Sequence, residues 1–479
     1  MRKIKNFSVI WFVIINCMLY SMTASAGDQT FHHQMEITLS PGTAEIWVKD
    51  HISIPVQNQN HKTPIKLDFS LHGDLTVTDA QGAQVTLRQS NAASDTRPIP
   101  LKHYTLTLPP QQKDVTLHFS GKINHPVQGP GQEYARSFSY TPGVISSEGV
   151  FLANSSAWYP QFDDALVSFR LNIQVPAGWD VVSQGTLVSE QKTSTAQHVI
   201  WEEKQSQDDI YIVAGRYKRY TQSAGAADAL VYLRSTDDAL AQKYLDTTAQ
   251  YIAMYNKLLG PYPYTKFALV ENFWETGYGM PSFTLLGPKV IRFPFILHSS
   301  YPHEILHNYW GNGVFVDYAK GNWAEGLTAY LADHLVNEQR GKGDEYRRDV
   351  LQKYTDFVNK EKDFPITQFV SRHSSSSEAV GYGKTMMFFH MLRQELGDEN
   401  FVRALRQFYK QFKFKQATFD DLQTTFSTIA GKDFSQHFAQ WIHRSGAPNL
   451  HLKQAHAERT AQGFKLKLLV EQTQPGELY

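Results

Sequence analysis

The chain has 479 residues, of which 42% are hydrophobic, and its 46 basic and 46 acidic residues give a formal net charge of zero at pH 7. A chain of this length and apolar content can bury a large core and is expected to divide into two or more domains. The balanced charge gives no sign of nucleic-acid binding, so no nucleic-acid partner is expected.

Residues 1–26 have the pattern of a secretory signal peptide. Basic residues at the start precede an apolar run from Val9 to Leu19, and Ala24, Ser25 and Ala26 stand before Gly27. We expect cleavage after Ala26 and a secreted or periplasmic protein without stable membrane association. An uncleaved anchor is the alternative, although the apolar run is short for a membrane span.

Cys17, the only cysteine, lies inside this segment, and Asn16 before it makes a poor lipoprotein cleavage site. The mature protein is therefore expected to have no disulfide, so packing and metal binding must stabilise the fold. Cleavage would also remove three basic residues, leaving 43 basic and 46 acidic residues.

Residues 27–222 are dominated by alternation of apolar and polar residues, broken by turn-forming residues. Examples of the alternation are 34–39, 104–108, 115–119 and 169–175. Many short segments of this kind predict an antiparallel β domain. His32 and His33 have no visible cluster of partners, and we expect them to be exposed residues of an N-terminal tail.

The pattern changes after a small, polar stretch, 222–228, which we interpret as a linker. Apolar residues recur with helical spacing from Asp238 to Leu259, and Gly260 with Pro261 ends that predicted helix. A strand is expected at 266–270. This change of period marks the start of a second domain, 223–447.

The segment from Tyr301 to His334 contains the strongest functional motif. His303 and His307 are four residues apart, so on a helix both imidazoles project from one face and can reach one metal ion, with Glu304 beside the open coordination position. Pro302 is compatible with the first helical turn, where its missing N–H has no partner.

A catalytic zinc ion requires a third protein ligand. Glu325, in the sequence Asn-Trp-Ala-Glu-Gly-Leu-Thr-Ala-Tyr, opens a second helical stretch that ends near Arg340. We therefore predict one Zn²⁺ per chain, bound by His303, His307 and Glu325. The alternative for a motif this short is a pair of surface histidines beside a helical glutamate.

His-Glu-Ile-Leu-His-Asn-Tyr-Trp-Gly-Asn followed by Trp-Ala-Glu-Gly-Leu-Thr-Ala-Tyr resembles the alanyl aminopeptidase (aminopeptidase N) family of gluzincin metallopeptidases. The resemblance implies a multidomain α+β fold, in which a saddle-shaped antiparallel β domain precedes a thermolysin-like, mainly helical catalytic domain. It is strong around the predicted metal site and weak in the first half of the chain. Seventeen residues separate His307 from Glu325, one fewer than is usual in the family.

The resemblance also assigns roles to other residues. It makes Glu304 the general base and Tyr382 the group that donates a hydrogen bond to the oxyanion. It implies that Gly277, Tyr278, Gly279 and Met280 line the substrate cleft. We expect Asp333 to be one candidate for holding a ligating imidazole by its other nitrogen.

One departure from the family concerns recognition of the peptide N-terminus. Pro281 stands where the family has a glutamate that binds the free amine. A buried ammonium group requires a carboxylate partner. Glu275 is a candidate substitute, with Glu271 as another, although Glu275 also fits a solvated loop residue.

Downstream, helices are predicted at 344–357, 385–396, 402–412, 420–429 and 434–444, and the run of four serines at 374–377 suggests a flexible surface loop. From 448 to 479 the alternation returns, which predicts the start of a β-sandwich domain or a stub of one.

The sequence thus predicts a zinc metallopeptidase that acts on peptides, as an aminopeptidase releasing N-terminal residues. Three alternatives remain: a peptidase with altered end specificity that resembles an endopeptidase, a non-peptide hydrolase of the same fold, and a catalytically inactive binding domain. The presence of His303, Glu304, His307, Glu325 and Tyr382 together argues against the last.

Overall fold

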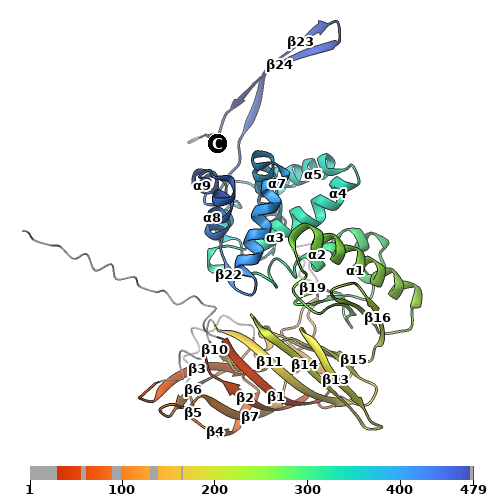
Figure 1. The fold of residues 1–479 in the computed structure, drawn as a ribbon, viewed down its shortest axis with the longest axis vertical. Coiled ribbons are helices and arrows are strands. Elements are labelled where there is room, and N and C mark those ends of the chain that lie inside the picture. The colour runs from red at the N-terminus through yellow and green to blue at the C-terminus, as the bar shows by residue number, and fades with distance from the viewer. Residues whose placement is uncertain (1–29, 56–60, 89–98, 130–138, 163–164, 475–477) are drawn as a thin grey trace, which may run out of the picture.

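The computed structural model of the chain describes residues 30–55, 61–88, 99–129, 139–162, 165–474 and 478–479; the predicted signal peptide lies outside these residues. A β-rich domain is followed by a helix-rich domain, and a long hairpin extends beyond the helices at the C-terminal end (Figure 1). Among the described residues, no helix combines the length and apolarity that a membrane crossing requires.

The β domain is built on a seven-stranded sheet. Its strands alternate buried and solvent-facing residues, as the sequence pattern predicted. In spatial order they are β13 (Thr186–Lys192), β14 (Ala196–Gln207), β11 (Leu166–Pro176), β1 (Thr30–Ser40), β2 (Glu45–Ser53), β7 (Asp114–Lys122) and β4 (Leu75–Gln81).

One pairing in this sheet differs from the antiparallel prediction. β1 and β11 run parallel, with Thr30 opposite Leu166 and Thr38 opposite Gln174, whereas the other pairs of the sheet are antiparallel. Alternation along a strand gives its buried face but not the direction of its neighbour, so the sequence pattern could not reveal this pair.

Two four-stranded sheets complete the β domain. The first has the order β10 (Gln161–Phe162), β3 (Ile65–His72), β6 (Leu101–Leu108) and β5 (Gln84–Leu87). The second has the order β12 (Asp180–Val182), β15 (Ile212–Gly215), β9 (Gly149–Leu152) and β8 (Val144–Ser146). Apolar side chains from all three sheets share one core.

His33 is not an exposed tail residue. It lies in the middle of the seven-stranded sheet, fully buried, and its Nδ1 is 2.8 Å from Asp50 Oδ2 on the neighbouring strand. The prediction for His33 was wrong because Asp50, its partner, lies seventeen positions away and becomes adjacent only when β1 pairs with β2. His32, beside it, is half-buried and bonds Ser168.

The second domain begins with a mixed five-stranded sheet of order β16 (Lys218–Ser223), β17 (Asp228–Leu233), β18 (Lys266–Glu271), β20 (Phe283–Leu286) and β19 (Gly277–Met280). β16 and β17 form an antiparallel hairpin. The stretch 222–228 is therefore largely the turn of this hairpin and not a linker, and the sheet pairing moves the domain boundary from 222 to a position before β16.

Helix α1 (Asp238–Leu259) has the bounds that its periodicity predicted. The Asp237 side chain accepts a hydrogen bond from the backbone N–H of Leu240 and caps its start, and Gly260, at φ 117°, ends it. The buried side chains of α1 share one apolar core with side chains of β17 and β18, and the helix covers one face of the sheet (Figure 1).

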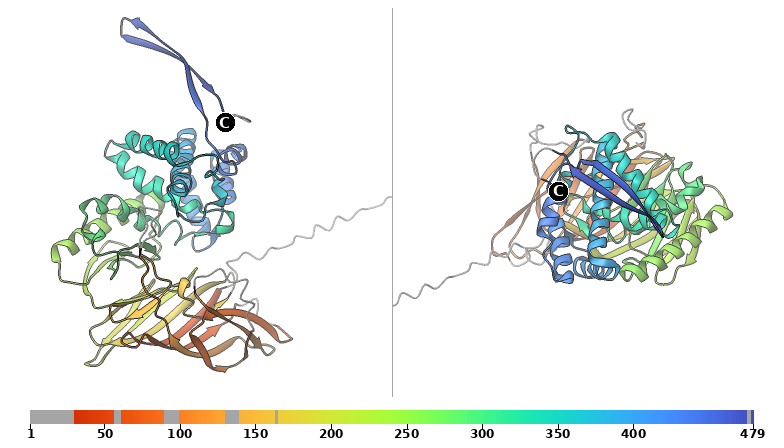
Figure 2. Two further views of the ribbon diagram at one scale, coloured as in Figure 1. Left: turned by 180° about the vertical axis from the view of Figure 1, so that it is seen from behind. Right: turned by 90° about the horizontal axis from the view of Figure 1, so that it is seen from above.

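The remaining helices form the upper part of the domain (Figures 1 and 2). They are α2 (Ser300–Leu306), α3 (Trp323–Thr328), α4 (Leu335–Gln339), α5 (Gly343–Phe357), α6 (Ser375–Glu378), α7 (Thr385–Phe412), α8 (Phe419–Ala430) and α9 (Ser435–Ile442). α7 unites two predicted helices across a kink at Gly397, whose φ is 75°. Two short strands, β21 (Phe315–Val316) and β22 (Gln416–Ala417), pair in parallel.

Two helices of this domain contain a π-helical turn. The first, η7 (Ala329–His334), joins α3 to α4, and the second, η9 (Ala379–Lys384), joins α6 to α7. π-Helical turns are frequent at functional sites, and both of these border the cavity described below.

The serine run is not a flexible surface loop. Ser374 caps α6, accepting a hydrogen bond from the backbone N–H of Ser377, and the Ser377 side chain is fully buried. Serine is a favoured N-cap residue, and here the run starts the helix that leads to Tyr382.

An apolar cluster joins the two domains. It includes Phe151, Val182 and Val213 of the β domain and Leu230, Val270 and Phe283 of the five-stranded sheet. Trp274 adds a hydrogen bond from its indole N–H to the carbonyl of Ser139 at 3.1 Å. This shared core fixes the β domain against the second domain.

The C-terminal residues form a single hairpin, β23 (Leu450–Thr460) and β24 (Gly463–Gln472). Nearly all of its side chains are exposed, and it extends away from the helices (Figure 2). The predicted strands are present, and the described residues of this region add no further strand to them.

Candidate metal centre and catalytic cavity

Helix α2 presents the two predicted histidine ligands. His303 lies in its second turn and His307 caps its C-terminal end. The helical spacing places both imidazoles on one face, with ring centroids 4.7 Å apart.

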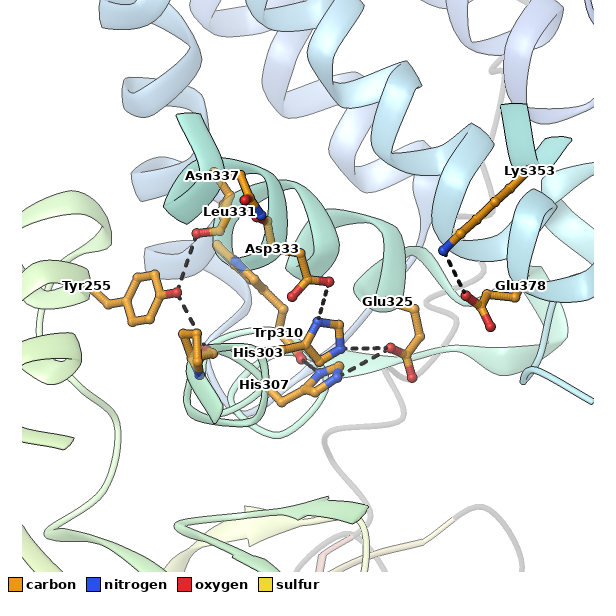
Figure 3. A network of polar contacts seen from close by, with 11 residues as sticks. Tyr255, His303, His307, Trp310, Glu325, Leu331, Asp333, Asn337, Lys353 and Glu378 are labelled. Atoms are coloured by element: carbon orange, nitrogen blue, oxygen red, sulfur yellow. Dashed lines mark hydrogen bonds and ion pairs between the residues drawn. The ribbon is translucent and has the colours of Figure 1, made fainter. Parts of the chain in front are cut away.

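Glu325 meets these histidines from α3, where the Asn322 side chain caps the helix and fixes its first turn. Glu325 Oε2 lies 3.4 Å from His303 Nε2 and 3.3 Å from His307 Nε2 (Figure 3). One potential ligand atom from each of the three residues lies within 4.8 Å of the others. The structure therefore brings together the three residues predicted to bind the metal.

Each imidazole is held by its second nitrogen. His303 Nδ1 is 3.1 Å from Asp333 Oδ2, and His307 Nδ1 donates to the carbonyl of Trp310 at 2.9 Å (Figure 3). Because a carbonyl only accepts, the proton of neutral His307 is on Nδ1 and the lone pair of Nε2 faces Glu325. Such contacts orient metal-binding histidines, and the expected role of Asp333 agrees with this geometry.

The electrostatics of the site favour an ionised third ligand. Burial alone raises the pKa of a carboxyl group, but the positive charge of the His307 and His303 imidazoles in their protonated forms outweighs this effect and holds the pKa of Glu325 well below its usual value. Two imidazole nitrogens and one carboxylate oxygen on one side of a cavity fit a catalytic zinc ion, whereas Ca²⁺ and Mg²⁺ prefer oxygen ligands. The residues present therefore fit Zn²⁺.

Glu304 lies between the two histidines on α2 and lines the same cavity. The edge strand β19 approaches it very closely: a β-carbon at Gly279 would lie 2.3 Å from Glu304 Oε2. A side chain at this point of the cavity wall would therefore displace the Glu304 carboxylate from its present position.

Tyr382 enters the cavity from the π-helical turn η9. Its ring lies nearly parallel to that of His303, with centroids 6.2 Å apart, and the guanidinium of Arg372 lies 5.6 Å from the centroid of the Tyr382 ring. Burial and the carboxylate of Glu325 raise the pKa of Tyr382 well above its usual value. The hydroxyl therefore keeps its proton and can act as a donor.

The cavity has a volume of about 1550 Å³ and lies between the β domain, β19 and the helices around the metal centre. Gly277, Tyr278 and Gly279 line it, as predicted. Met280 does not: it is buried in the apolar cluster between the domains.

The two carboxylates proposed to replace the family's amine-binding glutamate also point elsewhere. Glu275 accepts a hydrogen bond from the backbone N–H of Lys289 at 3.0 Å and is not among the described residues that line the cavity. Glu271 is buried and pairs with Arg292 at 2.7 Å. Neither is placed to bind a substrate amine, because each already holds a neighbouring loop in place.

Several other residues that line the cavity carry no functional signal in the sequence. They include Asp208 and Tyr211 of the β domain, Phe293 and Phe295 at 3₁₀-helix η5 (Pro294–His298), and Tyr318 of η6 (Tyr318–Lys320). No local pattern marks them, since only the tertiary packing brings these separate segments to one cavity.

Comparison with known proteins agrees with this geometry. Residues 298–441 match the model of the peptidase family M1 domain. The chain is 24% identical over 237 residues to mitochondrial aminopeptidase 2 of Saccharomyces cerevisiae, covering 46% of this chain and 25% of that protein. It is 21% identical over 335 residues to leucyl aminopeptidase of Saccharolobus solfataricus, covering 65% of this chain and 42% of that protein. The chain thus spans less than half the length of these relatives.

Solved structures of similar fold cover more of the chain. The M1 zinc metallopeptidase of Deinococcus radiodurans superposes with a TM-score of 0.64 at 17% identity, over 89% of this chain and 98% of that one. A variant of it bound to a Tyr-Ser-Ala substrate superposes with a TM-score of 0.65 at 16% identity, over 88% and 95%. Residues 298–441 therefore match a peptidase family M1 domain, and the two-domain likeness shows that the chain shares the fold of these zinc metallopeptidases.

Proposed function

We propose that this protein is a zinc-dependent aminopeptidase that releases N-terminal residues from peptides. The observation that carries the proposal is the convergence of His303, His307 and Glu325 beside Glu304 in one large cavity. The names of the aminopeptidase relatives support a peptide as the substrate.

The proposed chemistry divides between the metal and the side chains of this chain. A bound zinc ion supplies a Lewis acid, which polarises the scissile carbonyl and acidifies water. Glu304 takes the proton of the attacking water and passes it to the leaving amine. Tyr382, protonated at neutral pH, donates a hydrogen bond to the oxygen that becomes negative in the transition state.

A peptidase with altered end specificity is the second candidate. It is favoured by Pro281, which offers no carboxylate, and by the position of Glu275 and Glu271 away from the cavity. A site without an anion for the peptide amine would also accept blocked or internal segments.

The test compares one set of peptides with free and with acetylated N-termini, using the purified protein with zinc and Glu304→Gln as the blank. Stepwise release of single residues from free peptides alone supports the aminopeptidase. Equal cleavage of both forms identifies the endopeptidase-like alternative. No cleavage of either form, with zinc bound, contradicts a peptidase and directs attention to non-peptide substrates.

The localisation is proposed on the sequence alone. The signal-peptide pattern of residues 1–26 supports a secreted or periplasmic enzyme. Mass spectrometry of the protein from the periplasm or medium of expressing cells should give an N-terminus at Gly27, whereas a chain retained at full length in the cell contradicts this proposal.

A further inference from the structure

Asp208 supplies a carboxylate to the catalytic cavity from the β domain. It follows directly after β14, its side chain is exposed, and it lines the same cavity as His303, Glu304 and Glu325. The question is what this carboxylate binds.

Most other carboxylates of the cavity are already engaged. Glu325 faces the two histidines, Asp333 contacts His303, and Glu378 lies 3.7 Å from Lys353. Glu304 has the proposed role of proton transfer. In the part of the chain that the structure describes, no lysine or arginine forms an ion pair with Asp208, and only backbone N–H groups contribute hydrogen bonds to it.

Buried neighbours hold Asp208 in place. Gln207 is fully buried, and its side-chain oxygen accepts from the Tyr264 hydroxyl at 3.3 Å. Asp209 is also buried and accepts from the Tyr159 hydroxyl at 3.0 Å and from the backbone N–H of Ile210 at 2.7 Å. A residue fixed on both sides presents its side chain to the cavity without a large entropic cost of ordering.

The Asp208 segment is connected to the metal centre. The Tyr264 hydroxyl, which contacts Gln207, also donates to the carbonyl of Asn312 at 2.6 Å. Asn312 follows Gly311, where an added β-carbon would lie 3.5 Å from His307 Nδ1. On the cavity wall, burial raises the pKa of Tyr318, and the Asp208 and Glu325 carboxylates both add to this shift.

The local electrostatics favour a cationic ligand. Asp208 is accessible from the cavity, but the protein atoms around its carboxyl group partly desolvate it and raise its pKa to about 6. The group is therefore mostly ionised at neutral pH and lacks a compensating charge. An ammonium or guanidinium group placed against it would form a charge-assisted hydrogen bond.

We propose that Asp208 binds a cationic group of the peptide substrate, either the α-ammonium of its N-terminus or the side chain of a basic residue. This inference rests on the proposed peptidase function. Asp208, which belongs to the β domain, would then supply the negative charge that the glutamate at the position of Pro281 supplies in the family.

The experiment uses Asp208→Asn, which keeps the shape of the side chain and removes its charge. Glu275→Gln is the matched control, because its carboxylate lies outside the cavity. Four versions of one peptide are compared: free or acetylated at the N-terminus, with leucine or arginine near that end. Losing one hydrogen bond to a charged group should lower kcat/KM by about 10- to 100-fold for the peptides that carry the cation bound by Asp208, mainly through a higher KM.

Each outcome is decisive. A loss confined to the free peptides identifies the α-ammonium, and a loss confined to the arginine peptides identifies a basic side chain. The proposal is overturned if the ratios of kcat/KM among the four peptides are the same in Asp208→Asn and Asp208→Ser as in wild type, while both variants keep the wild-type unfolding midpoint and zinc content.

A binding measurement separates this proposal from the proposed function. With zinc-loaded Glu304→Gln as the background, Asp208→Asn should weaken the affinity for the recognised peptides by the same factor. If the wild-type enzyme cleaves no peptide, the proposed function fails. If it cleaves peptides and the Asp208 variants bind and cleave them as the wild type does, the proposed function stands and the role of Asp208 fails.

Discussion

Asp333 and His303 lie thirty positions apart in the chain, yet Asp333 Oδ2 is 3.1 Å from His303 Nδ1. Asp333 belongs to the π-helical turn η7, which continues the helix of Glu325. One helical segment thus supplies both a predicted ligand and the group that orients another.

Replacing Asp333 with alanine should weaken zinc binding by about 10- to 100-fold, because the His303 imidazole loses the partner that fixes its orientation. Competition with a chromogenic chelator measures the affinity. Asp349→Ala, an exposed carboxylate of α5, is the control. Equal affinity of Asp333→Ala and wild type would show that α2 alone orients His303.

Gly279→Ala should impair catalysis without loss of zinc. The new β-carbon would lie 2.3 Å from Glu304 Oε2, so the carboxylate or β19 must shift. Misplacing a catalytic group by about 1 Å can cost roughly 100-fold in rate. Steady-state kinetics and metal analysis test this, with Gly42→Ala as control, since nothing lies within 4 Å of a β-carbon there. Wild-type kcat/KM in Gly279→Ala would contradict the close approach.

Removing zinc should abolish activity and also lower stability. Glu325 is ionised and faces two imidazoles, so the metal ligands are in place in the folded chain. A ligand present at 1,000 times its dissociation constant stabilises the folded state by about 4 kcal/mol. Thermal unfolding with and without a chelator measures the change, and added zinc should restore the midpoint. His303→Ala should not respond to the chelator.

Lys266 should make stability depend on pH. Its ammonium group is buried between the rings of Trp201 and Phe283 and bonds Ser282 Oγ at 2.7 Å. Burial lowers the pKa of Lys266 from 10.5 to about 7. Between these values the unfolded chain binds a proton that the folded chain does not, so the free energy of unfolding should rise with pH by roughly 1.4 kcal/mol per unit.

Lys266→Met should remove this slope, leaving a flatter dependence between pH 7 and pH 10. Denaturant unfolding at several pH values measures it, with the exposed Lys410→Met as control. The same slope in Lys266→Met as in wild type would mean that other groups cause the dependence.

Local features were readable from the sequence because they depend on neighbours in the chain. The bounds of α1 follow from its apolar spacing, the cap at Asp237 and Gly260. The spacing of His303 and His307 predicts a shared helical face, and Glu325, which opens the next helical stretch, is predicted from the sequence as the third ligand.

The tertiary structure decided the features that depend on distant partners. The sequence predicts an exposed His33, because Asp50 becomes its neighbour only in the sheet. It also offers Glu275 as a candidate partner of the substrate amine, whereas the Glu275 carboxylate accepts a hydrogen bond from the backbone N–H of Lys289. The parallel pairing of β1 with β11 is another such feature.

The sequence by itself therefore determined the secondary structure around the metal centre and the chemistry of its ligands, since periodicity, caps and ligand spacing act within a few residues. Only the tertiary structure decided which side chains surround the substrate. The cavity forms where two domains share an apolar core, and the side chains facing it, Asp208 among them, are selected by that packing and not by any local pattern.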